Sequence, residues 1–338
     1  MRESFPLRPQ RNHLERSAVV VSRRANLDSN AVNHGLEHDA LIYGTDEALV
    51  DTLVPWLLEG RAQGDGSVVA TTSPHIAQFR EALGADADSM SFVAADDLYV
   101  QPVQTIAAWQ RILVDAAAAG VAYTRIVGEV AFGTEPDEQT SWTRYESALN
   151  AVFERSPAWI VCPYDSRVLP RDVIDQASRT HPTVWNSTRH KSDRYEVPAR
   201  LLREIVEPSR VVTGAPNFEL GIDDRMGEVR GLVRTAGLQA GLAHARVEEL
   251  VLAVSELAGN TVRHAGGGGR LALWVTSEGV VCEVTDRGAG LQDPLVGLVP
   301  PKPHASAGMG LWIARQLSDS FAIGGGDNGT TVRIAVDR

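Results

Sequence analysis

Between His38 and Asp165, short apolar runs alternate with longer amphipathic stretches, and this alternation constrains the fold more than any other feature of the sequence. Runs such as SVVATT and AWIVCPYD are apolar at successive positions rather than at every second one. A strand has this character when both faces of its sheet are covered. The stretches between the runs have the length and period of helices. The region therefore predicts a doubly wound α/β domain with a parallel sheet, over 36–198.

The second half of the sequence has a different rhythm. Helices expected at 223–238 and 244–265 precede strands at 270–278 and 280–286, and a further helix and a last strand follow. Helices combined with antiparallel strands pack as two layers, with the helices on one face of the sheet. We therefore predict a two-layer α/β sandwich over 213–338.

Two further segments complete the predicted organisation. Residues 199–212 contain a proline and change the rhythm of the chain, so they are predicted to be a linker. Residues 1–35 mix arginine, proline and serine around one short apolar patch and are predicted to be a flexible tail. A chain of 338 residues is long enough for two domains of ordinary size.

Composition narrows the classes of function. The net charge of −11 provides no basic face for a phosphate backbone, so nucleic acid is not expected as a partner. No apolar run reaches the roughly 18 residues of a membrane span, and the first thirty residues lack the apolar core of a signal peptide. We therefore expect a cytoplasmic protein without membrane contact. Cys162 and Cys282 lie in separate apolar stretches and are expected to be buried free thiols.

One predicted helix carries a carboxylate and an amide on the same face. Glu256 and Asn260 lie four residues apart in ELAGNTVRHA, so their side chains are one turn apart. An amide oxygen can bind Mg²⁺, and a carboxylate one turn earlier can orient or deprotonate a nucleophile. Such a pair also occurs on solvated helix faces without any function, so the pair alone leaves both interpretations open.

A second motif follows the strand that ends at Asp286. Gly288 and Gly290 come directly after this carboxylate. A carboxylate at a strand end can accept the exocyclic amine of adenine, and glycines nearby let the backbone approach the purine. An ordinary surface turn has the same composition, so this motif is also ambiguous when taken alone.

Two more motifs lie near the C-terminus. Gly308 and Gly310 open a predicted helix, where exposed amides and the positive end of the helix dipole favour phosphate. Thr330 enters the last strand, and its hydroxyl could support Asp286 through water. A plain loop-to-helix junction remains the alternative for the glycine pair.

In their order and spacing, these motifs together resemble the GHKL superfamily of ATPases, and most of all the anti-sigma-factor serine kinases of bacteria. The resemblance covers about 210–338 and includes the short segment between Gly290 and Gly308, which is similar to the lid of that branch. It implies a Bergerat-type fold that binds ATP with Mg²⁺.

The same resemblance implies roles for individual residues. Glu256 would be the catalytic base, Asn260 the Mg²⁺ ligand and Asp286 the adenine contact. The glycines would be lid hinges and phosphate contacts, and a threonine would be a further contact on the adenine side; these residues are Gly288, Gly290, Gly308, Gly310 and Thr330.

The first half resembles the MEDS-type sensory domain, whose fold is similar to RecA-type ATPases, on the stretches HDALIYGT, VGEVAFG and CPYD. No G-x-x-x-x-G-K-[ST] motif is present, so a working phosphate loop is not expected. Ligands of open α/β sheets bind at strand ends, and the polar residues there form a candidate pocket for an unknown small ligand. These residues are His38, Tyr43, Glu129, Cys162 and Tyr164. Hydrogen-bonded packing is the alternative for each of them.

Together the two resemblances imply a switch protein. A sensory domain would control a serine/threonine kinase domain that phosphorylates an anti-sigma-factor antagonist, and a sigma factor would be a second candidate partner. A homodimer through the ATP-binding domain is also implied by the family.

Two other hypotheses remain open at the level of sequence. The protein could be a nucleotide-gated module that binds its partner without appreciable kinase activity. It could also be a sensor histidine kinase, although no helical hairpin carrying a histidine precedes the ATP-binding motifs. Three of the histidines before these motifs lie instead in surroundings rich in Pro or Asn; they are His34, His181 and His190.

Overall fold

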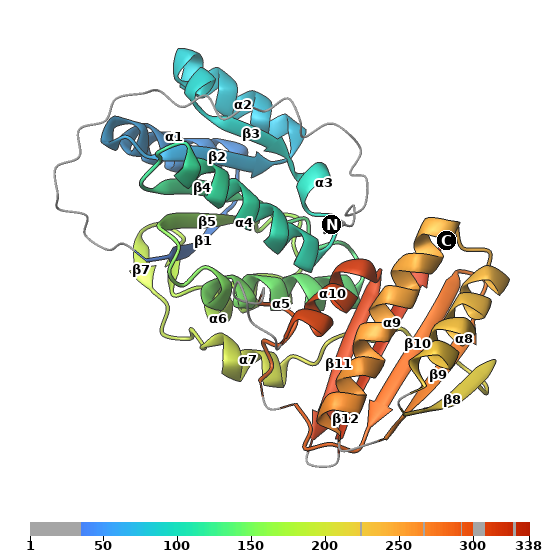
Figure 1. Ribbon diagram of the computed structural model, residues 1–338. Coiled ribbons are helices and arrows are strands. Elements are labelled where there is room, and N and C mark those ends of the chain that lie inside the picture. Colours follow the sequence, from blue (N-terminus) through green and yellow to red (C-terminus); the bar gives the residue numbers. More distant parts are fainter. Residues whose placement is uncertain (1–34, 224, 266–267, 292, 300–307, 327–328) are drawn as a thin grey trace.

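The computed structural model describes residues 35–338 with the exception of 224, 266–267, 292, 300–307 and 327–328. It shows two α/β units that follow one another along the chain, each built on its own sheet (Figure 1). The predicted tail, 1–35, lies outside the described residues apart from Gly35.

Strands and helices alternate through the first unit, as the sequence predicts. In chain order its elements are β1 (Glu37–Tyr43), α1 (Asp46–Gln63), β2 (Gly66–Thr71), α2 (Ser73–Leu83), the 3₁₀ helix η2 (Gly84–Ser89), β3 (Ser91–Ala94), α3 (Ala95–Leu98), α4 (Pro102–Ala118), β4 (Thr124–Gly128), α5 (Pro136–Val152), β5 (Ala158–Asp165), α6 (Arg171–Thr180), β6 (Thr183–Trp185) and β7 (Arg189–Lys191). The sheet has the order β3-β2-β4-β5-β1-β6-β7. Its pairs are parallel except for β6 with β7, which is antiparallel.

Both faces of this sheet are buried. Successive residues of a strand point to opposite faces, so each central strand contributes side chains to two cores, one on each face of the sheet. On β1, Ala40 packs in the core beneath α4, α5 and α6, whereas Leu41 packs in the core beneath α1 and α2. On β5, Ile160 and Val161 divide in the same way. This double burial explains the continuous apolar runs and confirms the expected α/β layering.

The second unit is a five-stranded antiparallel sheet covered by helices on one face (Figure 1). Its elements are β8 (Phe218–Ile222), α8 (Met226–Gln239), α9 (His244–His264), β9 (Gly269–Val275), β10 (Gly279–Asp286), α10 (Met309–Leu317), β11 (Ser320–Gly326) and β12 (Gly329–Asp337). The sheet order is β11-β12-β10-β9-β8. The two-layer α/β sandwich is confirmed. The sequence prediction missed both edge strands, β8 and β11.

The segment between the units is partly helical. Helix α7 (Pro198–Glu204) occupies the first half of the predicted linker, 199–212. Its Leu201 and Leu202 are buried, and Leu202 belongs to the core beneath α5. Arg144 of α5 donates hydrogen bonds to the carbonyl oxygens of Leu202, at 3.1 Å, and Ile205. The first half of this segment is therefore packed onto the N-terminal unit.

Candidate functional site

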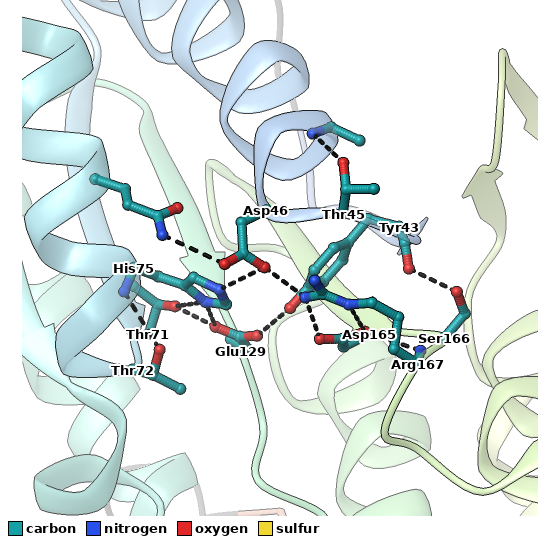
Figure 2. A network of polar contacts seen from close by, with 12 residues as sticks. Tyr43, Thr45, Asp46, Thr71, Thr72, His75, Glu129, Asp165, Ser166 and Arg167 are labelled. Carbon is teal, nitrogen blue, oxygen red and sulfur yellow. Dashed lines mark hydrogen bonds and ion pairs between the residues drawn. The ribbon is translucent and has the colours of Figure 1, made fainter.

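Polar side chains meet at the carboxyl ends of three strands of the N-terminal sheet (Figure 2). Tyr43 is the last residue of β1, Thr71 is the last residue of β2, and Glu129 directly follows β4. These strands run parallel in one sheet, so their carboxyl ends lie along the same edge. Such an edge is where open α/β sheets bind their ligands.

Glu129 is the common acceptor of this cluster, which we call the Glu129 cluster (Glu129, Tyr43, Thr71 and His75). The Tyr43 hydroxyl donates to Oε1 at 2.6 Å, and the Thr71 hydroxyl donates to Oε2. Nδ1 of His75, in the first turn of α2, lies 2.9 Å from Oε2. All four residues are buried. The Glu129 carboxylate is therefore removed from water, and three protein groups satisfy it instead.

The charges in the cluster stabilise one another. A hydrogen bond with Glu129 raises the pKa of His75, against the opposing effect of burial. Burial alone would raise the pKa of Glu129, but hydrogen bonds from His75, Thr71 and Tyr43 outweigh it and lower that pKa. Burial and the neighbouring Glu129 raise the pKa of Tyr43. The cluster therefore favours a protonated His75, an ionised Glu129 and a neutral Tyr43.

An ion-paired rim adjoins the Glu129 cluster (Figure 2). Arg167 donates to both oxygens of Asp165, at 2.8 and 2.6 Å, and also to Asp46 at the start of α1. Nε2 of His75 lies 3.6 Å from Oδ1 of Asp46, which connects the rim with the cluster. Three carboxylates, counting Glu129, thus face one arginine and one histidine. This edge suits a cationic or hydrogen-bonding ligand better than a phosphate.

Sequence reasoning found only part of this constellation. It selected Tyr43 and Glu129 but missed Thr71, His75 and Arg167. Each missed residue lies in or within four positions of a strand end. Systematic inspection of the residues that follow each predicted strand would have found them.

The five predicted sensory residues do not form a single pocket. Tyr43 and Glu129 lie at the carboxyl edge of the sheet described above. His38, Cys162 and Tyr164 instead point to the face of the sheet away from Tyr43, which α5 and α6 cover. Sγ of Cys162 lies 3.4 Å from Nε2 of His38, and the Tyr164 ring packs against the ring of His181 with centroids 5.7 Å apart. Burial raises the pKa of the Cys162 thiol.

In the second unit, α9 presents its carboxylate and amide to the start of α10. A Cβ atom added to Gly310 would lie 2.9 Å from Oε2 of Glu256 and 3.0 Å from Nδ2 of Asn260. Gly308 precedes α10 as its N-cap with φ of +88°, a conformation that favours glycine. The structure thus brings these four residues to one place, next to the N-terminus of a helix.

The two α9 side chains differ in their partners. Among the described residues, the Glu256 carboxylate has no hydrogen bond or ion pair. Oδ1 of Asn260, in contrast, accepts a hydrogen bond of 2.8 Å from Nη2 of the exposed Arg263. Arg263 would have to turn away before this oxygen could bind a metal ion.

Asp286 holds the turn that follows β10. Its Oδ1 accepts from the backbone N–H groups of Gly288, at 2.8 Å, and Thr330, at 3.1 Å. The main-chain amide of Thr330 thus contacts Asp286 directly. A Cβ atom on Gly288 would lie 3.2 Å from Cα of Ala265, so this glycine lets the turn approach the end of α9. Gly290 has φ of +74°. Among the described residues, Oδ2 of Asp286 has no hydrogen-bond partner.

Comparison with known families matches both halves. Residues 37–182 match the family described as MEDS, the methanogen/methylotroph, DcmR sensory domain. Residues 223–336 match the family described as the histidine kinase-like ATPase domain. The chain contains a MEDS domain followed by a histidine kinase-like ATPase domain. No curated protein matches the chain.

The ATPase domain contacts the MEDS domain through α10. Gln316 of α10 donates to the carbonyl oxygen of Val103 at 3.0 Å, and Gln101 donates to the carbonyl oxygen of Asp319 at 3.0 Å. Trp312 of α10 packs against the core of the MEDS domain, together with Leu298 from the described part of the segment before α10. The helix that begins at the candidate nucleotide site is therefore anchored on the sensory domain.

A cavity of about 630 Å³ lies at this junction. It is lined by the start of α4, the first half of α5, the linker around Glu207, the end of α10 and the start of β11. Buried Arg144 and Arg315 face it from the two domains.

In the part of the chain that the structure describes, no helix combines the length and apolar character needed to cross a membrane.

Proposed function

We propose that the protein is a cytoplasmic, Mg-ATP-dependent regulatory kinase. In this proposal the ATPase domain phosphorylates a serine or threonine of an anti-sigma-factor antagonist, and the MEDS domain, with a RecA-like fold, senses an unknown small ligand. A sigma factor is a second proposed partner, and pairing of ATPase domains is the proposed route to a homodimer. The observation that carries the proposal is the convergence of Glu256 and Asn260 on the first turn of α10.

The side chains of this site fit Mg-ATP. At Gly310 a Cβ atom would fill the space beside Glu256 and Asn260, so the glycine keeps open a cradle at a helix N-terminus, which favours phosphate. Asn260 would provide an oxygen ligand to Mg²⁺ once Arg263 turns outward. The unpartnered Oδ2 of Asp286 would accept from the amine of adenine.

The chemical roles follow from these positions. Bound Mg-ATP supplies the phosphoryl group and neutralises part of its charge. Glu256, which is half-buried and has no described partner, would accept the proton of the target hydroxyl. The backbone amides at the start of α10 would orient the phosphates.

Regulation is proposed to pass through α10. This helix begins at the nucleotide site and ends at the contacts with α4 and the linker. A ligand bound at the Glu129 cluster would alter the loops that follow β1, β2 and β4, and thereby the packing of the MEDS domain against α10. Two states that differ in this packing would differ in nucleotide affinity.

A nucleotide-gated binding module without kinase activity is the second candidate. The hydrogen bond between Arg263 and Oδ1 of Asn260 favours it, because a nucleotide bound while Arg263 stays in place would lack this metal ligand and would be held without transfer. The histidine kinase alternative receives no such support. His181 is fully buried and His190 lies on the short edge strand β7, so neither lies on a helical hairpin; His34 lies outside the described residues.

Transfer from labelled ATP to a candidate antagonist tests the kinase directly. We expect Mg-dependent label on serine or threonine of the antagonist, and no transfer by Asn260→Ala. Ser255→Ala changes the same helix one residue before Glu256 and is the control. Nucleotide binding with no transfer to any antagonist captured from the native cytosol would favour the binding module, and acid-labile label on the protein itself would favour a histidine kinase.

A further inference from the structure

Four potential metal ligands converge in the core of the MEDS domain, on the face of the sheet away from the Glu129 cluster. They come from β1, α5, β5 and the residue that follows α6. We call them the four-donor cluster (His38, Glu146, Cys162 and His181). None is more than 2% exposed.

The distances between the donor atoms match those around a tetrahedral ion. Oε2 of Glu146 lies 3.3 Å from Nε2 of His38, from Nε2 of His181 and from Sγ of Cys162. Sγ of Cys162 lies 3.4 Å from Nε2 of His38, and all four atoms lie within 4.8 Å of one another. Tetrahedral Zn²⁺ with its usual bond lengths requires separations of about 3.3–3.6 Å between nitrogen, oxygen and sulfur ligands.

The outer nitrogen of each histidine is already used. Nδ1 of His38 lies 3.1 Å from Oδ1 of Asn150, whose own Nδ2 donates to the carbonyl oxygen of Thr180 at 2.8 Å and so fixes the amide orientation. Nδ1 of His181 lies 3.0 Å from the carbonyl oxygen of Ala177. Both Nδ1 atoms therefore carry the proton, and in a neutral imidazole both Nε2 atoms present lone pairs to the cluster. Metal-bound histidines are oriented in this way.

With both imidazoles neutral, the centre of the cluster has too few protons for its acceptors. Two imidazole lone pairs face a carboxylate, and the Cys162 thiol is the one donor among the four groups. Nε2 of His181 and Oε1 of Glu146 are buried without a hydrogen-bond partner in the described part of the chain. Buried polar atoms are seldom left in this state unless something else satisfies them.

We propose that the four-donor cluster binds one divalent transition-metal ion, with Zn²⁺ as the best match. Thiolate, imidazole and carboxylate together suit Zn²⁺ and its first-row neighbours rather than Mg²⁺ or Ca²⁺, which prefer oxygen. On binding, the Cys162 proton leaves to solvent, and the charges of thiolate and carboxylate balance the ion. All four positions are filled by protein, so the ion is structural or regulatory, and it ties α5 and the end of α6 to the sheet.

Cobalt titration of the full-length, tag-free protein tests the site. The protein is stripped with a chelator, returned to buffer without nucleotide, and titrated with Co²⁺. We expect one equivalent to produce the visible bands of tetrahedral Co²⁺ and a thiolate charge-transfer band, and Zn²⁺ to abolish both. Elemental analysis of unstripped protein is expected to show a matching amount of metal.

Variants assign the signal to these residues. Cys162→Ser is expected to remove the charge-transfer band, whereas Cys282→Ser, which changes the other buried thiol, is expected to keep it. Asn150→Ala, which removes the partner of His38, is expected to weaken Co²⁺ binding roughly 10–100-fold. The proposal would be overturned if the wild-type protein showed no tetrahedral Co²⁺ bands, a result that does not depend on the folding of any variant. An unchanged charge-transfer band in a folded Cys162→Ser variant would also overturn it.

Discussion

The guanidinium of Arg315 is paired with the carboxylate of Glu207 between the two domains. Nη2 of Arg315 donates to Oε2 at 3.1 Å, and Nη1 donates to Oε1. The two side chains are only 6% and 9% exposed, and Arg144 of the MEDS domain reaches to 3.9 Å from the same carboxylate. One buried linker carboxylate thus joins α5 with the helix that starts at the nucleotide site.

Glu207→Gln is expected to destabilise the full-length protein by roughly 3–5 kcal/mol, the range for removing one partner of a buried ion pair. The substitution leaves two buried guanidinium groups without their shared carboxylate. Urea denaturation of wild type and variant measures the difference. Glu248→Gln, which removes an exposed partner of Arg234, is the control and should change stability little. Equal effects of the two substitutions would contradict the importance of the junction pair.

Asp286→Asn tests the adenine contact. The amide keeps an oxygen that can accept from the backbone amides of Gly288 and Thr330, so the turn is preserved, but Oδ2 is replaced by a donor. We expect ATP affinity to fall by about 1–3 kcal/mol, the range for losing a hydrogen bond to a charged acceptor. Calorimetric titration with ATP provides the measurement. Titration with GTP, whose base lacks the amine of adenine at that position, is the comparison. An unchanged ATP affinity would show that adenine is held elsewhere.

The pair formed by His75 and Glu129 predicts a pH dependence of stability. The hydrogen bond with Glu129 raises the pKa of His75 in the folded protein. A raised folded pKa contributes stability that is fully present below the unfolded pKa of about 6.5 and is lost as the pH rises through the folded value. We therefore expect the advantage of wild type over His75→Gln to decline above about pH 6.5.

Two measurements check this prediction. The free energy of unfolding is measured for both proteins across the pH range in which Glu129 stays ionised, and NMR titration follows the ring of His75 itself. His190→Gln, which changes an exposed histidine of β7, should leave the pH profile unaltered. An advantage that grows with pH would mean that His75 is neutral in the folded protein.

The layering of both domains was predictable because it depends on local pattern. The run AWIVCPYD forms β5 over its whole length. Both faces of this strand are covered, so apolar residues occupy successive positions and the strand can be recognised from the sequence alone. The edge strand β8, by contrast, alternates between half-buried and exposed positions before Ile222. The sequence offers no continuous run there, and only pairing with β9 defines this strand.

The sensory residues show a different limit. His38 and Tyr43 both lie near an end of β1, which predicts a shared pocket, yet they are five positions apart on this strand and therefore point to opposite faces. Counting by twos along the strand would have separated them. Glu146 and His181 could not have been joined to His38 by counting, because they come from α5 and the end of α6 and meet only when these helices pack on the sheet.

Glu256 provides the sharpest test of kinase chemistry, because a general base acts in the transition state and contributes little to binding of the ground state. Glu256→Gln keeps the shape of the side chain and one hydrogen-bonding oxygen, but its amide cannot take up a proton. The substitution also preserves the packing of α9 against the start of α10, near Gly310.

We expect Glu256→Gln to bind ATP with near-normal affinity while phosphoryl transfer slows by roughly 10²–10⁴, the usual contribution of a general base. A loose transition state would place the loss toward the lower end of that range. Affinity and transfer are measured on one preparation, with Glu249→Gln on the same helix as the control. Equal losses of affinity and transfer would make Glu256 a binding residue. Normal transfer would show that another group accepts the proton, and the kinase proposal would then need a different base near the first turn of α10.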